Sequence, residues 1–586
     1  MKKISISIAL LFLLVSSIVW YGNTNDERIL YFRDYSLLIG GPLSIFMLLA
    51  HIRNGEALKM SKMDCIILAF FLCTVFRTDD KSFNNEFILK SVLYFILYLA
   101  VRSNENSKLL VQPLNFIIIF FYWVLSSIGV FEFILYRADF QSHITYNFSN
   151  SGVFGSYLAL GFPVLLNSYF LWYENANKYA KGVLIYLIIQ MIFVIILTTA
   201  RACWVGTFIA SMLIILTHNT VKMDSKKLAT AISTFIFFVV TPFLLKIKWA
   251  SAMGRLLIYK VSFLAIENNF LLGYGNGRFA SIYNQYQGQY FSEHSNLRTN
   301  FFEWNIADSM RMPCNEYLQV FIEMGFIGFL LTFCAIAVFI FAFFTNKYKE
   351  KSVYLGFFAS IISILVCAFF SYPFQETPIC LLSIVMIGTI VREVDKSAFT
   401  FNIHLSKAIL LVLVALSSWA SYCTFEKLRY KKEWQNTAKE AAKGTFNETE
   451  YEHLYSSLST DSKFLYNYGC ELSKAGQYEK SIHILDEAMK MVIDEKLLCF
   501  QAENYYQTKQ FDKTEAAYIL ACNIVPSRFF PKFFLMDYYI KIGNNTKAIE
   551  VGQKMIAMPE KIPNQESRQV KSMVKHLVDS LKTVIK

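Results

Sequence analysis

Long apolar runs, each with at most one Asp, Glu, Lys or Arg, alternate with charged segments from residue 1 to residue 422. The apolar core of a bilayer is about 30 Å thick and needs roughly 20 apolar residues in a helix, so each run bounded by charges predicts one membrane-spanning helix. The sequence therefore predicts an all-α, polytopic membrane protein with 12–13 transmembrane helices. The thirteen runs are Ile4–Trp20, Tyr35–Ile52, Met63–Phe76, Phe87–Val101, Leu109–Leu135, Val153–Tyr173, Val183–Ala200, Ala202–Thr217, Leu228–Leu245, Gly325–Phe344, Tyr354–Phe370, Ile379–Val391 and Ala408–Tyr422.

Lysine and arginine are shared unevenly between the loops on the two sides of these spans. With the N-terminus in the cytoplasm, the inner loops hold 16 of these residues and the short outer loops hold 6. Cytoplasmic loops carry an excess of Lys and Arg, so this orientation is predicted. An odd number of spans then places the C-terminal tail outside, on the same side as the long segment after span nine.

Two polar pieces remain: an outer segment at 246–324 between spans nine and ten, and a tail at 423–586 that follows the transmembrane domain at 1–422. In the tail, Gly476-Gln-Tyr478, Lys509-Gln-Phe511 and Gly543-Asn-Asn545 recur at intervals of 33 and 34 residues. This resembles the tetratricopeptide repeat, a helix-turn-helix unit with a period of about 34 residues. The resemblance implies that the tail binds a protein partner and performs no chemistry; an unrelated helical tail is the alternative.

Composition agrees with a membrane protein and excludes several other classes. Hydrophobic residues make up 55% of the chain and charged residues 17%, against roughly 25% charged in soluble domains. The net charge of +12 is dispersed between apolar runs, whereas a nucleic-acid binder would concentrate it on one face. The eleven Cys form no Cys-x-x-Cys pair and no cluster with His, so neither a zinc site nor a disulfide framework is expected.

Arg201 is the only charged residue between Val183 and Thr217. Thirty-five helical residues would extend about 52 Å, which is too long for one crossing, so the chain must turn near Thr198–Arg201. This places Arg201 at the outer membrane edge. An arginine in a span is costly and needs a reason; the alternative is an arginine that extends to the surface at a tight turn.

The outer segment brings together a helix with one polar face and a glycine run. In a helix from about Gly254, the side chains of Arg255, Tyr259 and Ser262 share a face. Glycines allow backbone N–H groups to approach an anion closely, although a simple surface turn would use the same residues. The glycines are Gly273, Gly275 and Gly277.

A polar stripe lies at the start of span ten. Asn315 is a suitable N-cap for this helix, and behind it Glu316, Gln319 and Glu323 share one face of an otherwise apolar sequence. Polar groups at that position are costly unless they face a cavity.

Taken together, these features resemble the O-antigen ligase and polymerase superfamily. The resemblance covers about 109–391, and the family's long outer loop lies between spans nine and ten, as it does here. The residues that carry it are Arg201, the pair Gly254-Arg255, the run Leu271–Gly277 with Phe279, the run Asn315–Gln319 followed by Glu323-Met-Gly325, and Ser371–Phe374 after span eleven.

The resemblance implies an inverting glycosyltransferase that takes a glycan from undecaprenyl diphosphate at the periplasmic face of the bacterial inner membrane. Ligase members pass the glycan to a lipid A core sugar, related members pass it to Ser or Thr of a protein, and polymerases pass it to another repeat unit. The expected partners are therefore this lipid-linked glycan, one of these acceptors and the membrane lipids.

The diphosphate leaving group requires stabilisation of developing negative charge, and the planar guanidinium of arginine suits bidentate phosphate contacts. By resemblance, Arg201 and Arg255 take this role, so we expect metal-independent transfer without a cofactor. The remaining candidates for substrate binding are Lys260, Gly273, Gly275, Gly277, Arg278, Asn315 and Gln319.

One position departs from the family pattern. Ligase members usually have His immediately before the Asn of the Asn-x-Tyr-Leu run, where it is thought to activate the acceptor hydroxyl, but this chain has Cys314. A free thiol has a pKa near 8.5 and is mostly protonated at neutral pH. We therefore predict Glu316 as the base, because the helix N-terminus favours its ionised form. The alternative is that Glu316 only supports the start of the helix.

Three competing functions are weighed against ligase-like transfer. A polymerase of the same superfamily is the nearest, although the repeat tail favours ligase-like or protein-glycosylating members. A transporter of lipid-linked glycans would show inverted repeats and broken mid-membrane helices, whereas the polar residues here gather at the outer edge. A scaffold without enzymatic activity would leave Arg201 and Arg255 unexplained.

Overall fold

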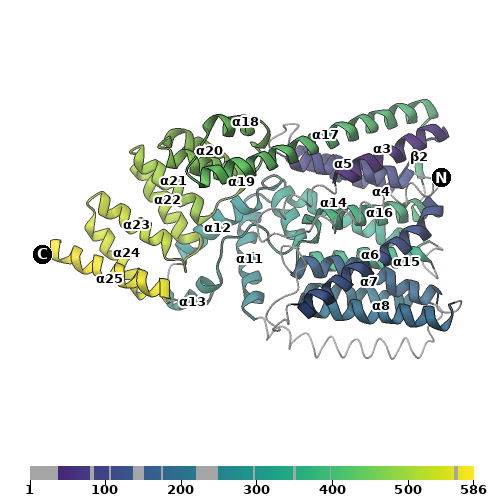
Figure 1. Cartoon of the computed structure of the whole chain (residues 1–586), viewed down its shortest axis with the longest axis horizontal. Coiled ribbons are helices and arrows are strands. Elements are labelled where there is room, and N and C mark those ends of the chain that lie inside the picture. Colours follow the sequence, from purple (N-terminus) through teal and green to yellow (C-terminus); the bar gives the residue numbers. More distant parts are fainter. Residues whose placement is uncertain are drawn as a thin grey trace. The chain divides into compact units, whose positions relative to one another are not determined.

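The computed structural model describes residues 37–78, 85–103, 107–135, 151–172, 176–218, 249–294, 297–346, 352–395, 397–559 and 565–585. Within these ranges the chain forms 22 α-helices and one small sheet (Figure 1). The prediction of an all-α, multi-pass membrane protein is confirmed. The small sheet is the antiparallel pair β1 Lys59–Ser61 and β2 Ser397–Thr400, in which Met60 lies opposite Phe399.

Eleven of the thirteen expected spans fall on described residues, and a helix covers each of them. The other two, Ile4–Trp20 and Leu228–Leu245, lie outside the described residues. The eleven helices are α3 Leu37–Asn54, α4 Lys62–Phe76, α5 Glu86–Ser103, α6 Ser107–Leu135, α7 Ser151–Trp172, α8 Lys178–Leu197, α9 Arg201–Thr217, α14 Glu316–Phe344, α15 Val353–Ala368, α16 Thr377–Val394 and α17 Ile403–Ala442.

In the described ranges, eight helices are long and apolar enough to cross a membrane. Seven of them coincide with expected spans. The eighth is α11 Trp249–Asn268, which lies in the expected outer segment at 246–324 and carries Arg255 and Lys260. Length and composition alone place α11 among the eight, so its position outside the membrane stays a prediction.

The chain divides into two compact units. The first, called the membrane unit here, comprises 1–246, 314–320 and 327–429; the second, the loop–tail unit, comprises 247–313, 321–326 and 430–586. Most of the outer segment, 247–313 and 321–324, is therefore grouped with the tail, whereas 314–320 is grouped with the spans. The expected division at 422 and 423 stays a prediction, but the backbone has no break there, because α17 continues to Ala442.

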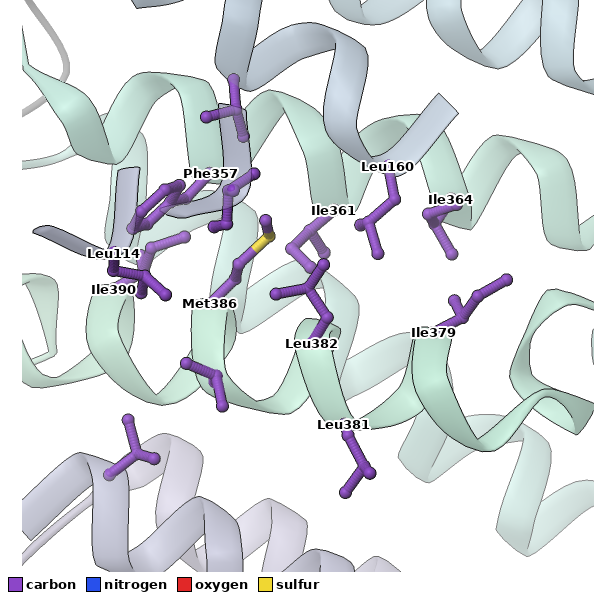
Figure 2. Packing of buried hydrophobic residues seen from close by; sticks show 14 of the residues in the cluster. Leu114, Leu160, Phe357, Ile361, Ile364, Ile379, Leu381, Leu382, Met386 and Ile390 are labelled. Atoms are coloured by element: carbon purple, nitrogen blue, oxygen red, sulfur yellow. The ribbon is translucent and has the colours of Figure 1, made fainter. Parts of the chain in front are cut away.

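Small residues allow the helices of the membrane unit to pack closely. A Cβ atom on Gly206 of α9 would lie 2.5 Å from the carbonyl oxygen of Ser363 in α15, and one on Gly161 of α7 would lie 2.2 Å from the ring of Tyr122. Such close approach is typical of helix packing in membranes. Figure 2 shows how the core continues between α15 and α16, where labelled leucine, isoleucine and methionine side chains face one another.

The loop–tail unit contains α11, two further helices of the outer segment and eight helices of the tail (Figure 1). They are α12 Phe279–Glu293, α13 Leu297–Ile306, α18 Glu448–Leu458, α19 Ser462–Lys474, α20 Tyr478–Met491, α21 Glu495–Gln507, α22 Phe511–Ile524, α23 Phe530–Lys541, α24 Asn545–Ala557 and α25 Gln565–Ile585.

Three hairpins in the tail repeat the same turn. The pairs α19 and α20, α21 and α22, and α23 and α24 each turn at a residue with positive φ, namely Gly476 (78°), Lys509 (59°) and Gly543 (74°). These are the positions that the sequence aligned. In the first pair a Cβ on Gly469 would lie 2.4 Å from Leu485, so a larger residue would separate the helices. The helical repeat is thus observed, while its likeness to the tetratricopeptide repeat stays a prediction.

Two contacts agree with the expected arrangement of the loops. Strand β1 lies in the expected inner loop before α4, and its partner β2 lies in the expected inner loop before α17. Helix α12 of the outer segment packs against α22 of the tail. Segments that pack together lie on the same side of the membrane. Four expected spans separate α12 from the tail, and an even number returns the chain to the side from which it came.

Candidate active site

The turn before Arg201 is tight and well held. Thr199 has a φ of 53° between α8 and α9, and Arg201 is the first residue of α9. The indole N–H of Trp204 donates to the carbonyl of Ile195 at 2.9 Å, and the hydroxyl of Thr198 donates to the same carbonyl at 2.7 Å. The predicted turn between these two helices is confirmed. It leaves Arg201 half-buried at a helix N-terminus, where backbone N–H groups lack intrahelical partners.

Neighbouring helices fix the beginning of α9. A Cβ on Gly155 of α7 would lie 3.0 Å from both Ala200 and Cys203. The thiol of Cys367 in α15 donates to the carbonyl of Ala202 at 3.6 Å. The backbone on both sides of Arg201 is therefore packed against α7 and α15 and has little freedom to move.

The structure brings the Asn315–Gln319 run together with the segment that follows α15. Asn315 caps α14, because its side-chain oxygen accepts from the N–H of Leu318 at 3.1 Å. A carboxylate oxygen of Glu316 accepts from the backbone N–H of Phe374 at 2.8 Å, and the side chains of Gln319 and Gln375 are hydrogen-bonded at 3.2 Å. Two motifs more than fifty residues apart thus form one polar cluster in the membrane unit.

This cluster gives Glu316 a structural partner that the sequence did not show. By holding the N–H of Phe374, Glu316 fixes the short 3-10 helix η2 Pro373–Gln375 at the start of α16. One carboxylate oxygen is engaged in this way. Both roles considered for Glu316 remain compatible with the geometry.

Gly325 interrupts α14 with a φ of 67° and a ψ of −167°. The break separates the N–H of Phe326 from the carbonyl of Ile322, its partner in a regular helix. Both groups bond instead to the loop after α11: Phe326 donates to the carbonyl of Phe270 at 2.8 Å, and Tyr274 donates to that of Ile322 at 2.9 Å. The loop and the break complete each other's hydrogen bonding.

The glycine run takes part in the same contact. The N–H of Gly275 donates to the carbonyl of Glu323 at 2.8 Å, and the N–H of Gly273 donates to that of Asn269 at 3.1 Å. A Cβ on Gly273 would lie 2.4 Å from the backbone nitrogen of Gly325. These glycines therefore allow two backbone segments to touch, and the N–H groups of Gly273 and Gly275 are not available for an anion. All three have positive φ: Gly273 (65°), Gly275 (102°) and Gly277 (77°).

The last residue of the predicted polar stripe has a capping role. Glu323 is buried, and one of its carboxylate oxygens accepts from the N–H of Phe279 at 3.2 Å. Phe279 is the first residue of α12, whose N-cap Arg278 provides no side-chain cap. A carboxylate at a helix N-terminus is stabilised by the helix dipole. Glu323 thus completes the start of α12.

The cations of the outer segment differ in their partners. The ammonium of Lys260 donates to the hydroxyl of Tyr290 at 2.6 Å and to Glu303 at 3.2 Å, and the same hydroxyl donates to Glu303 at 2.6 Å. Burial raises the pKa of Tyr290, so it remains a neutral donor. The charge of Lys260 is thus balanced within the unit. Arg255, which is half-buried on α11, makes no hydrogen bond or ion pair within the described part of the chain.

The candidate residues are divided between the two units. Arg201, Asn315, Glu316 and Gln319 belong to the membrane unit, and the others belong to the loop–tail unit. In the ranges that the structure describes, no three His, Cys, Asp or Glu side chains could hold a metal ion together; metal-independent transfer stays a prediction. The candidates in the loop–tail unit are Arg255, Lys260, Gly273, Gly275, Gly277 and Arg278.

Sequence reasoning missed three features of this region. Thr199 and Cys314 both have a φ of 53°; Thr199 lies two residues before Arg201, and Cys314 lies directly before the Asn315–Gln319 run. Nothing in a single sequence signals left-handed backbone at a threonine or a cysteine. Glu376 is the third, a carboxylate only 4% exposed at the start of α16. Its position next to the Ser371–Phe374 run, between two apolar runs, could have drawn attention to it.

Comparison with known proteins adds one finding. No curated protein matches the chain. The model of a family described as O-antigen ligase matches residues 185–333, which extend from α8 into α14 and contain all ten candidate residues. About a quarter of the chain, the part that holds the candidate site, is therefore similar to the O-antigen ligase family, which supports the resemblance drawn from the motifs.

Proposed function

We propose that this protein is a membrane glycosyltransferase that transfers a glycan from undecaprenyl diphosphate to an acceptor at the periplasmic face of the bacterial inner membrane. The observation that carries the proposal is the match of residues 185–333 to the O-antigen ligase family. This match supports glycan transfer or polymerisation. The donor, the acceptor and the side of the membrane are parts of the proposal.

Each of the two arginines is assigned a contact with the diphosphate of the donor. Arg201 suits this role because it begins a helix, where the helix dipole and N–H groups favour an anion. Arg255 suits it because its charge is not balanced by a partner in the described part of the chain. A guanidinium binds two phosphate oxygens at once and stabilises charge as it develops on the leaving group.

In the proposed reaction, the acceptor hydroxyl attacks the anomeric carbon of the glycan from the side opposite the diphosphate. The new bond forms between the acceptor oxygen and that carbon, and the bond from the carbon to the phosphate oxygen breaks. Undecaprenyl diphosphate leaves with the electron pair, and the configuration inverts. The proton of the hydroxyl passes to the carboxylate of Glu316. No metal or cofactor takes part in this scheme.

The proposed acceptor is a lipid A core sugar or a hydroxyl of a protein. The helical repeat of the tail supports this choice over polymerisation, because a polymerase needs no additional binding domain for its acceptor. A polymerase would join one repeat unit to another with the same donor chemistry. Ligase-like transfer and polymerisation are therefore distinguished by the chemical identity of the product and not by the mechanism of transfer.

The experiment incubates the purified full chain with a glycan linked to a lipid diphosphate, a core glycolipid and an acceptor peptide, with EDTA present. We expect donor consumption and one product, which mass spectrometry identifies as glycolipid or glycopeptide. Arg255→Ala is the matched negative variant and should reduce transfer by about 10²-fold. Formation of longer glycan would identify the polymerase. No donor consumption, or equal rates for Arg255→Ala, would overturn the proposal.

A further inference from the structure

Helix α12 has two opposite faces that carry different contacts. Ser281, Asn284 and Gln287 lie on one side of the helix, and Tyr286 and Tyr290 lie on the other, as the helical repeat requires. The first face contacts the tail, and the second contacts α11 and the loop that follows it. All of these elements belong to the loop–tail unit.

The first face closes the ends of two repeat helices. The last carbonyls of an α-helix lack intrahelical partners, and polar side chains of α12 donate to the carbonyls at and just beyond the ends of α20 and α22. These side chains are at most 5% exposed. The bonds are Ser281 to the carbonyl of Met489 at 2.6 Å, Asn284 to that of Ile493 at 2.7 Å, and Gln287 to that of Ile524 at 2.6 Å.

The segment before α14 is held in the same way. Asn284 exchanges two hydrogen bonds with the backbone of Met310, at 2.9 and 3.1 Å, and Gln287 donates to the carbonyl of Asp308 at 3.0 Å. Arg528 of the tail donates to the carboxylate of Asp308 at 2.8 Å. Asn284 and Gln287 thus each join the tail to two parts of the outer segment.

The second face of α12 positions α11. Tyr290 bonds to Lys260 of α11 at 2.6 Å. Tyr286 shares a hydrogen bond of 2.9 Å with Tyr274, whose hydroxyl also bonds to the carbonyl of Ala265 in α11 at 3.0 Å. The order of contacts therefore runs from the tail through α12 to the helix that carries Arg255.

We propose that the tail is a positioning domain of the transferase, which acts through α12 to hold α11 and its Arg255 for donor binding. Asn284 and Gln287 are the positioning residues. This proposal rests on the proposed function of Arg255. The packing contacts that support it do not depend on that function. Where the repeat contacts α12, the tail binds this chain's own outer segment. That part of the repeat therefore does not bind a separate protein partner.

The test uses the full chain in detergent micelles and compares three forms: wild type, the double variant Asn284→Leu with Gln287→Met, and the control Gln285→Met. The double variant keeps side chains of similar length and removes their hydrogen-bonding groups. Gln285 lies between the two residues but is exposed, so its replacement changes only the surface. Hydrogen exchange of residues 270–279 and the donor kcat and KM are measured for each form.

We expect the double variant to exchange the 270–279 amides at least tenfold faster and to lose about 10²-fold in donor kcat/KM, because misplacement of about 1 Å can have that effect. The control should match wild type in both. If only 281–290 and the ends of α20 and α22 exchange faster, while 270–279 and kinetics stay as in wild type, the proposal is wrong. If the double variant does not fold, Ser281→Ala, which removes one bond, takes its place. If the wild type is inactive, the proposed function is wrong. The exchange rates of 270–279 then test by themselves whether α12 holds this loop in place.

Discussion

Two groups of residues adopt left-handed backbone near the candidate site, and they differ in kind. In the loop–tail unit these positions are glycines, and a Cβ atom on Gly273 or Gly325 would meet the backbone of another segment. In the membrane unit they are Thr199 and Cys314, which carry side chains. A left-handed residue with a Cβ costs roughly 1–2 kcal/mol. Close packing explains the glycines, whereas Thr199 and Cys314 carry a strain that glycine would avoid.

Thr199 and Cys314 both lie beside residues of the candidate site. Thr199 lies two residues before Arg201, and Cys314 lies directly before Asn315 and Glu316. Strained backbone is concentrated at functional sites, where the surrounding structure maintains it. We therefore treat the glycines as requirements of the fold and the two strained residues as features of the site. The following predictions test this division, beginning with the largest effect.

Gly273→Ala should abolish folding of the full chain or lower its stability by about 2–5 kcal/mol, since left-handed strain and overpacking both contribute. The new Cβ would collide with the backbone of Gly325, which cannot move away as a flexible side chain could. Gly476→Ala is the matched control, because Gly476 has a similar φ of 78° and open space around it. Thermal unfolding in detergent measures both, and equal losses would contradict the packing explanation.

Glu316→Gln should reduce glycan transfer by about 10²-fold, the effect typical of general acid–base catalysis, while thermal stability is retained. Glutamine can still accept a hydrogen bond from Phe374 but is not a base. Glu316→Ala should lose both transfer and stability, because it leaves the N–H of Phe374 without this acceptor. Transfer rates in membranes and melting temperatures are compared. Full activity of the glutamine variant would show that Glu316 only supports the turn.

Cys314→Ala should keep substantial transfer, and Cys314→His should be tolerated, because the thiol is not the predicted base. Cys314→Gly removes the side chain and the strain together. We expect it to be equally or slightly more stable, by at most about 1 kcal/mol, and to transfer several-fold more slowly because the start of α14 is less fixed. Loss of all transfer in the alanine variant, with a normal rate for Glu316→Gln, would assign the base to the thiol.

Thr199→Gly should give the smallest effect, a gain of about 0.5–1 kcal/mol in stability from released strain, net of the entropy cost of glycine. Transfer should fall several-fold, because the turn that holds Arg201 becomes more flexible. Lys509→Gly in the tail is the matched control: its φ is 59°, and the other two repeat turns already have glycine there. Melting temperature and transfer rate are measured for both variants. A similar loss of transfer in the control would remove the link between strain and the site.

Hydropathy and turn chemistry were enough to predict much of the fold. Each apolar run in the described part is a helix because about 20 apolar residues between charges have few other structures in a membrane. The turns at Gly476, Lys509 and Gly543 were found from their spacing, since a repeat shows its period in a single sequence. The turn before Arg201 followed from length alone.

The contacts within the site could not be predicted in this way. The pairing of Glu316 with Phe374, and that of Gly273 with Gly325, join segments whose approach depends on how other helices pack. The face of α12 formed by Ser281, Asn284 and Gln287 has no hydropathy signal, because polar residues that bind carbonyls look like polar residues that face water. A sequence shows which groups need partners but not where those partners lie.

The docking of α12 on the tail also sets an order of events during synthesis. Gln287 is separated from its partner Ile524 by 237 residues, which take about 12–47 s to make at about 5–20 residues per second. During this interval the outer segment has already emerged from the ribosome, but the carbonyls that its buried polar side chains will bind do not yet exist. The buried polar face of α12 therefore cannot complete its hydrogen bonds until α22 of the tail has been synthesised.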